Sequence, residues 1–258
     1  MIMKTNQMRN AECGMRNANN FAHANPFRTP HSALRTSAFT LVELLVVISI
    51  IAILAAFTVP VLSAVKKHQY ISQAQGELGQ LEAAIDSYHD AYGVYPPSNA
   101  AAGANGQVNQ LYYELEGTTN IAGTFCVMNN TNDQLSVTPV NQVQAAFGVG
   151  GFVNCSKFNA SEDSKPARNF IHELRPNQTA VISNTAPSFG FTILTGAVGG
   201  PDLTYKPLGA SGTNPWRYVS PGINNPNSYD LWIQLKIKGN TYLICNWSKQ
   251  VQVNNPLP

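Results

Sequence analysis

The fold is decided by the stretch SAFTLVELLVVISIIAILAAFTVPVLSAV, residues Ser37–Val65. Within it, Leu44–Val65 carries no charged residue. At about 1.5 Å of rise per helical residue, this run spans roughly 33 Å, the thickness of the hydrocarbon core of a bilayer. The stretch therefore predicts a transmembrane helix over residues 39–65.

Glu43 is the one residue of this stretch that does not suit an ordinary membrane anchor. A carboxylic acid within hydrocarbon costs roughly 2.5–3.5 kcal/mol even on insertion scales that give low values. A partner must offset that cost, unless the segment is a plain signal anchor whose Glu43 faces the lipid headgroups.

The string FTLVEL, Phe39–Leu44, follows a basic, polar segment and resembles the cleavage and methylation signal of type IV prepilins and of type II secretion pseudopilins. The resemblance implies that a membrane peptidase cuts between Ala38 and Phe39 and that the new N-terminus at Phe39 is methylated. It also implies that Glu43 pairs with the N-terminal ammonium of a neighbouring subunit, which would stabilise the buried acid. Ala38 is a departure, because most members carry Gly there.

Residues 1–38 are expected to form the leader that the peptidase removes. They hold more basic than acidic residues, so the positive-inside rule keeps this end in the cytoplasm and exports the C-terminal bulk. Leaders of the family are usually much shorter, so the true start stays open between Met1, Met8 and Met15. The basic residues are Lys4, Arg9, Arg16, Arg28 and Arg35, and the acid is Glu12.

The composition favours one exported head with β-structure and many loops, in addition to the membrane segment. The 258 residues are 44% hydrophobic and only 12% charged, with a net charge of +2. A charge so close to neutrality gives no support for nucleic-acid binding. Removal of the leader takes Cys13 away and leaves Cys126, Cys155 and Cys245, which permit at most one intramolecular disulfide. Its pairing stays open, with Cys126 and Cys155 as the favoured pair.

Residues 66–92 are expected to continue the helix beyond the membrane as its amphipathic half. Apolar residues recur here at alternating spacings of three and four, which places them on one helical face. Gly93 and Pro96-Pro97 predict the end of the helix. The simplest cover for the apolar face is a β-sheet from the rest of the chain, and a seam against a second helix is the alternative. The apolar residues are Ile71, Ala74, Leu78, Leu81, Ile85, Tyr88 and Tyr92.

Pro60 lies inside the predicted helix, where it removes one backbone hydrogen bond. We expect it to kink or loosen the helix around residues 57–60. In type IV filaments a proline at the matching place lies in a segment that melts on assembly, so the resemblance implies an assembly role for Pro60. A tolerated kink in a membrane helix is the alternative.

Residues 93–258 are expected to form a globular head with an antiparallel sheet over about 214–253. The strings NPWRYVSPG (214–222) and YDLW (229–232) resemble C-terminal elements of the head of the major, G-type pseudopilins of type II secretion. That class is therefore the closest match within the family.

The end of the chain predicts a β-hairpin. Apolar residues alternate over Leu231–Ile237, as in a half-buried strand. Gly239-Asn240 suits a two-residue turn, which pairs Ile237 with Tyr242.

The region 99–207 is longer than the connection found in compact pseudopilins, and we interpret it as an insertion that gives the filament its particular surface. Short strands are expected at 125–128, 180–182 and 189–194, and a helix around 167–174.

Little in the sequence suggests a metal site or an active site. Major pseudopilins bind calcium in an acidic loop, but the corresponding stretch Leu235–Asn240 holds lysines and no acid. Asp202, Asp230 and Asn224–Asn227 are the remaining oxygen ligands, so we expect no cofactor, with calcium as the open exception. No zinc-protease pattern, nucleophile elbow or phosphate loop is complete, so we expect a protein that is not an enzyme.

These patterns indicate an α+β, pilin-like fold: a long N-terminal helix whose N-terminal half is transmembrane and whose outer half packs on an antiparallel β-sheet head. The resemblance implies a structural subunit of a type IV pilus or a type II secretion pseudopilus, anchored in the bacterial inner membrane with its head in the periplasm. Its partners would be copies of itself, the prepilin peptidase and methyltransferase, the assembly platform and minor pilins. The alternative is a membrane-anchored periplasmic binding module or enzyme with an uncleaved anchor.

Overall fold

The computed structural model describes residues 39–99, 106–128, 138–157, 166–185, 188–196 and 202–255. Within these ranges, the side chains of residues 58–63, 138–141, 183–185 and 188–189 are not described. The chain divides into two units, residues 1–53 and 54–258, and each is described by itself. The predicted leader, with Ala38, lies outside the described residues.

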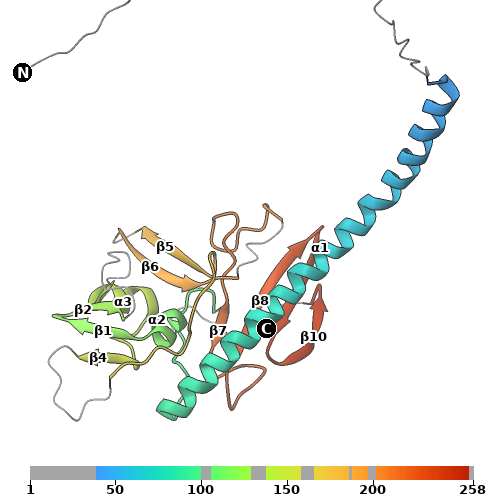
Figure 1. The fold of residues 1–258 in the computed structure, drawn as a ribbon. Coiled ribbons are helices and arrows are strands. Elements are labelled where there is room, and N and C mark those ends of the chain that lie inside the picture. Colours follow the sequence, from blue (N-terminus) through green and yellow to red (C-terminus); the bar gives the residue numbers. More distant parts are fainter. Residues whose placement is uncertain are drawn as a thin grey trace, which may run out of the picture. The chain divides into compact units, whose positions relative to one another are not determined.

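The predicted long helix is confirmed as α1, Leu41–Tyr92 (Figure 1). It ends as predicted at Gly93, whose φ of 73° leaves the helical range and whose amide donates to the carbonyl of His89 over 2.7 Å. Pro60 lies within these bounds, but its side chain is outside the described residues, so the predicted kink is not tested. Among the residues described, no helix has both the length and the apolarity needed to cross a membrane.

The predicted C-terminal antiparallel sheet is confirmed. Its four strands run in the order β10-β9-β8-β7, so neighbours in the sheet are also neighbours along the chain. The strands are β7 (Arg217–Val219), β8 (Asp230–Ile237), β9 (Asn240–Cys245) and β10 (Ser248–Val253).

The predicted register of the β8–β9 hairpin is wrong by two residues. Ile237 pairs with Asn240, so the turn is Lys238-Gly239. Both turn residues have positive φ, 51° for Lys238 and 81° for Gly239, as a two-residue type I′ turn requires. Asn240 instead joins the strand, where its side chain accepts a hydrogen bond from Asn254. A shift of two residues leaves every side chain on its predicted face, because the side-chain period of a strand is two.

The apolar face of α1 is covered by the C-terminal sheet, as predicted. Ala74, Leu78, Leu81, Ile85 and Tyr88 are all buried, and they share one core with the sheet. We call this cluster the helix–sheet core. The residues that β8 and β9 contribute to it are Leu231, Ile233, Leu235, Ile237, Tyr242 and Ile244.

Both faces of β8 are buried, so the prediction of a half-buried strand is wrong. Trp232, on the face away from the helix–sheet core, is only 1% exposed. It packs on Leu243 and Cys245, and its ring meets that of Trp247 edge-on at 5.6 Å between centroids. The periodicity of β8 predicted its inner face correctly and did not reveal this second layer.

The insertion builds a second core of its own, which we call the insertion core. Its predicted strands at 125–128, 180–182 and 189–194 are confirmed. A four-stranded sheet of order β3-β2-β1-β4 and the hairpin β5-β6 surround a cluster of aromatic side chains that includes Tyr113, Phe147 and Phe152. The elements are α2 (Leu111–Glu116), β1 (Thr118–Ile121), β2 (Thr124–Val127), β3 (Thr138–Pro139), α3 (Val140–Phe147), β4 (Cys155–Lys157), β5 (Thr179–Thr185) and β6 (Ser188–Leu194).

The helix predicted at 167–174 is absent; the described residues 166–174 form no helix. Their backbone amides bond elsewhere instead of within a helical turn. The amide of Arg168 donates to the side chain of Asn154, and that of Phe170 donates to the carbonyl of Leu115. Tertiary hydrogen bonds therefore override the local helix preference.

The favoured disulfide between Cys126 and Cys155 is wrong, since both thiols are free, as is that of Cys245. Cys126 pairs with Thr119 and Cys155 with Thr118, on opposite sides of β1. Two strand spacings of about 4.8 Å separate the cysteines by more than a disulfide can bridge.

Glu114 joins the two cores, although its side chain is completely buried. One carboxylate oxygen accepts from the amide of Val153 at 3.0 Å, and the other accepts from the amide of Asn154 at 3.0 Å and from the hydroxyl of Tyr88 at 2.9 Å. Burial raises the pKa of Glu114, and these donors oppose that rise. The hydroxyl of Tyr92 donates to Asn154 at 2.7 Å. α1 is thereby tied to the insertion through its last turns.

Glu114→Gln is expected to destabilise the protein by about 1–3 kcal/mol. An amide offers one oxygen where the carboxylate offers two, so its NH₂ group must face a buried donor. Chemical denaturation of the purified chain in detergent measures the loss. Asp90→Asn, at an exposed position of α1, is the matched control and should change stability by less than about 0.5 kcal/mol. Equal effects of the two substitutions would contradict a role for the buried carboxylate.

Two glycine substitutions are expected to act in opposite directions. At Gly239, with φ of 81°, Gly239→Ala puts a side chain into a left-handed turn at a cost of roughly 1–2 kcal/mol. At Gly76, inside α1, an added Cβ meets nothing within 4 Å, so Gly76→Ala should stabilise by roughly 0.5–1 kcal/mol. The same denaturation experiment reports both free energies of unfolding. A Gly239→Ala variant as stable as the natural chain would show this assignment of the turn to be wrong.

Candidate processing and assembly segment

Thr40 and Glu43 form a capping box at the start of α1. The backbone amide and hydroxyl of Thr40 donate to Oε2 of Glu43 at 2.9 and 2.7 Å, and the amide of Glu43 donates to the Thr40 hydroxyl at 3.2 Å. These bonds satisfy donors that a helix start would otherwise leave without partners. Glu43 therefore has a local role within its own chain, and the pairing with a neighbouring chain that its sequence context implies stays a prediction.

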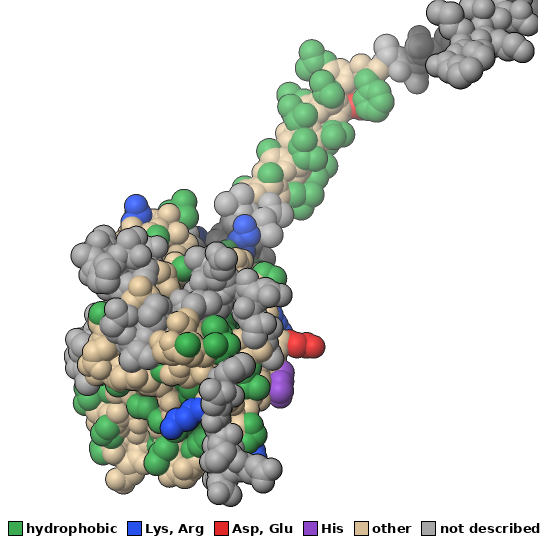
Figure 2. Space-filling model, turned by 90° about the vertical axis from the view of Figure 1, so that its left-hand side faces the viewer, with side chains coloured by type: hydrophobic (Ala, Val, Ile, Leu, Met, Phe, Trp, Pro, Cys, Tyr) green, Lys and Arg blue, Asp and Glu red, His purple; other side chains and the backbone are tan. Residues whose placement is uncertain are grey.

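The segment that follows exposes apolar side chains around the whole helix. Phe39 is 79% exposed, and the large hydrophobic residues from Leu41 to Phe57 are between 48% and 78% exposed. Figure 2 shows hydrophobic side chains gathered along this part of the chain. They are Leu41, Val42, Leu44, Leu45, Val46, Val47, Ile48, Ile50, Ile51, Ile53, Leu54 and Phe57. So large an exposed apolar surface marks this part of the helix as a candidate contact surface.

Two of the four predicted processing and assembly residues have described side chains. Phe39 lies two residues before α1 and Glu43 lies in its first turn, whereas Ala38 and the side chain of Pro60 lie outside the described residues. Thr40 was missed as a functional residue. Its signal was present as Thr-x-x-Glu immediately before an apolar run, the pattern of a capping box.

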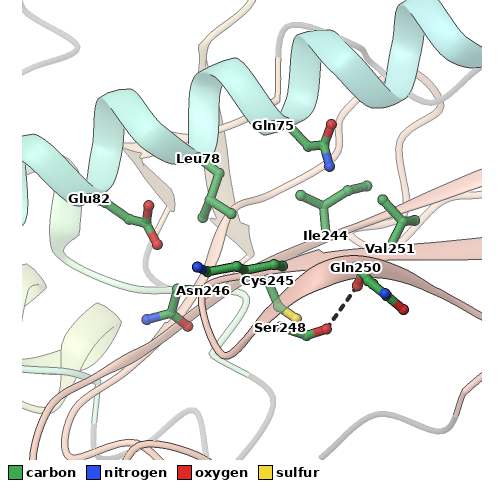
Figure 3. A pocket seen from close by; sticks show the side chains of 10 residues that line it. Gln75, Leu78, Glu82, Ile244, Cys245, Asn246, Ser248, Gln250 and Val251 are labelled. Carbon is green, nitrogen blue, oxygen red and sulfur yellow. Dashed lines mark hydrogen bonds between the residues drawn. The ribbon is translucent and has the colours of Figure 1, made fainter.

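A groove of about 340 Å³ lies between α1 and the β9–β10 hairpin (Figure 3). Leu78, Ile244 and Val251 give it an apolar floor, while Glu82 and Lys249 contribute charges. Burial raises the pKa of Glu82, and the nearby charge of Asp86 raises it further. Cys245 and Ser248 also line it, and the hydroxyl of Ser248 donates to the carbonyl of Gln250 at 2.9 Å.

The candidate calcium ligands are engaged in local structure. Asp230 accepts hydrogen bonds from the amides of Ile223, Asn224 and Asn225 at 2.8–3.0 Å, and Asp202 accepts from the amide and hydroxyl of Thr204. Within the described ranges, no three His, Cys, Asp or Glu side chains gather as a metal site would need. The acids therefore shape their own loops.

Comparison with known proteins bears on the N-terminal segment. Residues 34–59 match the family model described as the prokaryotic N-terminal methylation motif. The chain is 40% identical over 74 residues to the fimbrial protein EcpC of Eikenella corrodens. The aligned stretch covers 29% of this chain and 48% of that protein. The chain thus spans about half the length of this curated relative, and no solved structure gives a significant match. These matches support a type IV prepilin-like protein, and a helix followed by a β-sheet head is consistent with a pilin fold.

Thr40→Val is expected to loosen the start of α1 by about 0.5–2 kcal/mol, because it removes the hydroxyl while keeping the shape of the side chain. Hydrogen exchange of the amides of residues 41–44, measured on the full chain in detergent micelles, should become faster. Thr40→Ser keeps the hydroxyl and serves as control. Exchange that is equally fast in both variants would rule out the capping box.

Proposed function

We propose that the chain is a structural subunit of a filament of the type IV pilus or type II secretion pseudopilus kind. It is made as a prepilin, cut between Ala38 and Phe39, methylated at Phe39 and polymerised through the apolar half of α1. The observation that carries this proposal is the coincidence of the methylation motif at residues 34–59 with a helix that is apolar on every side from Leu41 to Phe57.

The proposal gives the exposed apolar surface a use. An isolated chain in water would leave this surface solvated. Covering it gains roughly 25 cal/mol of free energy for each Å² of apolar area removed from water. In a membrane the lipid covers it, and in a filament neighbouring helices do. We therefore propose that residues 39–65 anchor the precursor in the inner membrane before assembly and that the head lies in the periplasm.

The geometry of Glu43 supports a second contact in the filament. Both donors of Thr40 meet the same oxygen, Oε2. A carboxylate has two oxygens and about four acceptor positions, so Oε1 can accept from the N-terminal ammonium of a neighbouring subunit without disturbing the cap. Such a pairing would set the register between subunits.

Pseudopilin and pilus subunit remain separate versions of this proposal. The C-terminal sheet with Trp232, preceded by Trp216, supports the resemblance to a major, G-type pseudopilin. Lys236 at the end of β8, Lys238 in the turn and the insertion core depart from it. A filament subunit of either kind needs the prepilin peptidase, the assembly platform, minor pilins and copies of itself as partners. A tethered binding module or enzyme is the competing function, and it would have no use for cleavage before Phe39.

Intact mass and N-terminal sequencing of the protein extracted from membranes test the processing step. We expect a mature chain that begins at Phe39 and carries one extra methyl group. A chain that still begins at Met1, Met8 or Met15 would overturn the proposal in favour of the tethered module.

Glu43→Gln is expected to abolish filaments while leaving membrane insertion and cleavage intact. The amide oxygen can still accept from Thr40, but it carries no charge to pair with an ammonium. Electron microscopy and shearing assays on cells that make the variant report assembly. Thr40→Val is the matched control: it loses the cap, keeps the charge and should still assemble. Normal filaments from Glu43→Gln would refute the charge pairing.

A further inference from the structure

Arg217 is an unusual residue on the outer face of the C-terminal sheet. Its side chain is 1% exposed, although a guanidinium stays charged at any ordinary pH. It lies directly opposite Trp232 in the β7–β8 pairing, whereas its neighbour Tyr218 belongs to the helix–sheet core. Arg217 therefore points to the opposite face, into the layer formed by Trp232.

The guanidinium has fewer partners than a buried charge needs. Its Nη2 donates to the hydroxyl of Tyr205 at 2.9 Å, and that hydroxyl donates in turn to Gln234 at 2.9 Å. Nε and Nη1 of Arg217 are buried without a hydrogen-bond partner, and so is the indole Nε1 of Trp232, which is also 1% exposed. Three N–H donating atoms on two directly paired residues thus have no acceptor.

No carboxylate in the described ranges accepts a hydrogen bond from this guanidinium. Asp230, two residues from Trp232 on the same face of β8, uses both of its oxygens on the amides of Ile223, Asn224 and Asn225. Asp202 lies in the same turn as Tyr205, but its carboxylate accepts from Thr204, and the charge of Lys236 is the one that acts on it. An uncompensated charge held out of water is strongly unfavourable. Hydrogen bonds to an anion are the arrangement that would satisfy it.

We propose that Arg217 and Trp232 form a buried binding site for a small anion, a halide or a single carboxylate group. The anion accepts from the guanidinium of Arg217 and from the indole N–H of Trp232. The turn that carries Tyr205 closes the site, and its hydroxyl holds the guanidinium in place. The site gives the outer layer of the head its stability and is independent of the proposed filament function.

Thermal unfolding of the full chain in detergent, followed by circular dichroism, tests this site. Chloride, formate and phosphate are each titrated against bulky gluconate at constant ionic strength. We expect a saturable rise of the Tm, by about 5–10 °C at a concentration 100-fold above the midpoint. Saturation by chloride alone identifies a halide site, and saturation by formate identifies a carboxylate site.

Three variants separate the site from a general salt effect. Arg217→Met keeps the volume but removes the charge; it should lose the anion-dependent rise and be at least as stable as the natural chain in gluconate. Lys236→Met removes a cation that acts on Asp202 and should keep the rise. Trp232→Phe removes the indole N–H donor and should raise several-fold the anion concentration at which half of the Tm increase is reached.

The proposal would be overturned if the anions raised the Tm of Arg217→Met as much as that of the natural chain. It would also be overturned if the Tm did not saturate with any of the three anions. If Arg217→Met does not fold, Trp232→Phe decides alone, and an unchanged midpoint then excludes the site.

Discussion

The burial of one apolar helical face against one sheet is the constraint on which the rest of the head depends. Ile85 of α1 and Leu231 and Ile233 of β8 are fully buried against each other in the helix–sheet core. Full burial of a side chain of this size contributes roughly 1.5–3 kcal/mol. Because the helix comes first in the chain and the sheet last, this core closes only when the two ends of the head meet. Everything between them is a connection, and a connection can grow without disturbing the contact.

The insertion has grown enough to need its own core and its own attachment. Aromatic side chains around Tyr113 fill the insertion core, while Glu114, the next residue on α2, points to α1. Buried polar atoms must find partners, and here the donors come from Tyr88 of α1 and from the loop at Val153 and Asn154. The same few bonds therefore satisfy a buried acid and fix the insertion to the helix.

At the start of α1, the carboxylate of Glu43 caps the helix through Oε2, and its Oε1 is available for the proposed contact with a neighbouring chain. Glu43 caps its own helix through one oxygen, which removes part of the penalty of placing an acid beside an apolar run. The apolar residues that follow have no cover within the described part of their own unit. The first turn of α1 thus has its hydrogen bonds satisfied within the chain, while the apolar surface that follows stays exposed, as the proposed assembly requires.

The sequence by itself determined the elements whose cause is local. The helix with its stop at Gly93, the stripe from Ala74 to Tyr88 and the existence of the C-terminal hairpin all follow from periodicity and turn residues, which act over a few positions. The methylation motif that matches residues 34–59 was equally readable, because it is a short linear pattern.

Only the tertiary structure decided the features in which distant residues compete. The hairpin turn is Lys238-Gly239 and not Gly239-Asn240, since Asn240 pairs with Ile237 in the sheet and accepts a hydrogen bond from Asn254. The helix predicted at 167–174 was lost to hydrogen bonds with Asn154 and Leu115, and β1 keeps Cys126 and Cys155 apart. Glu114 and Arg217 look like surface charges in the sequence, since burial depends on which segments fold over a residue and no local pattern records it.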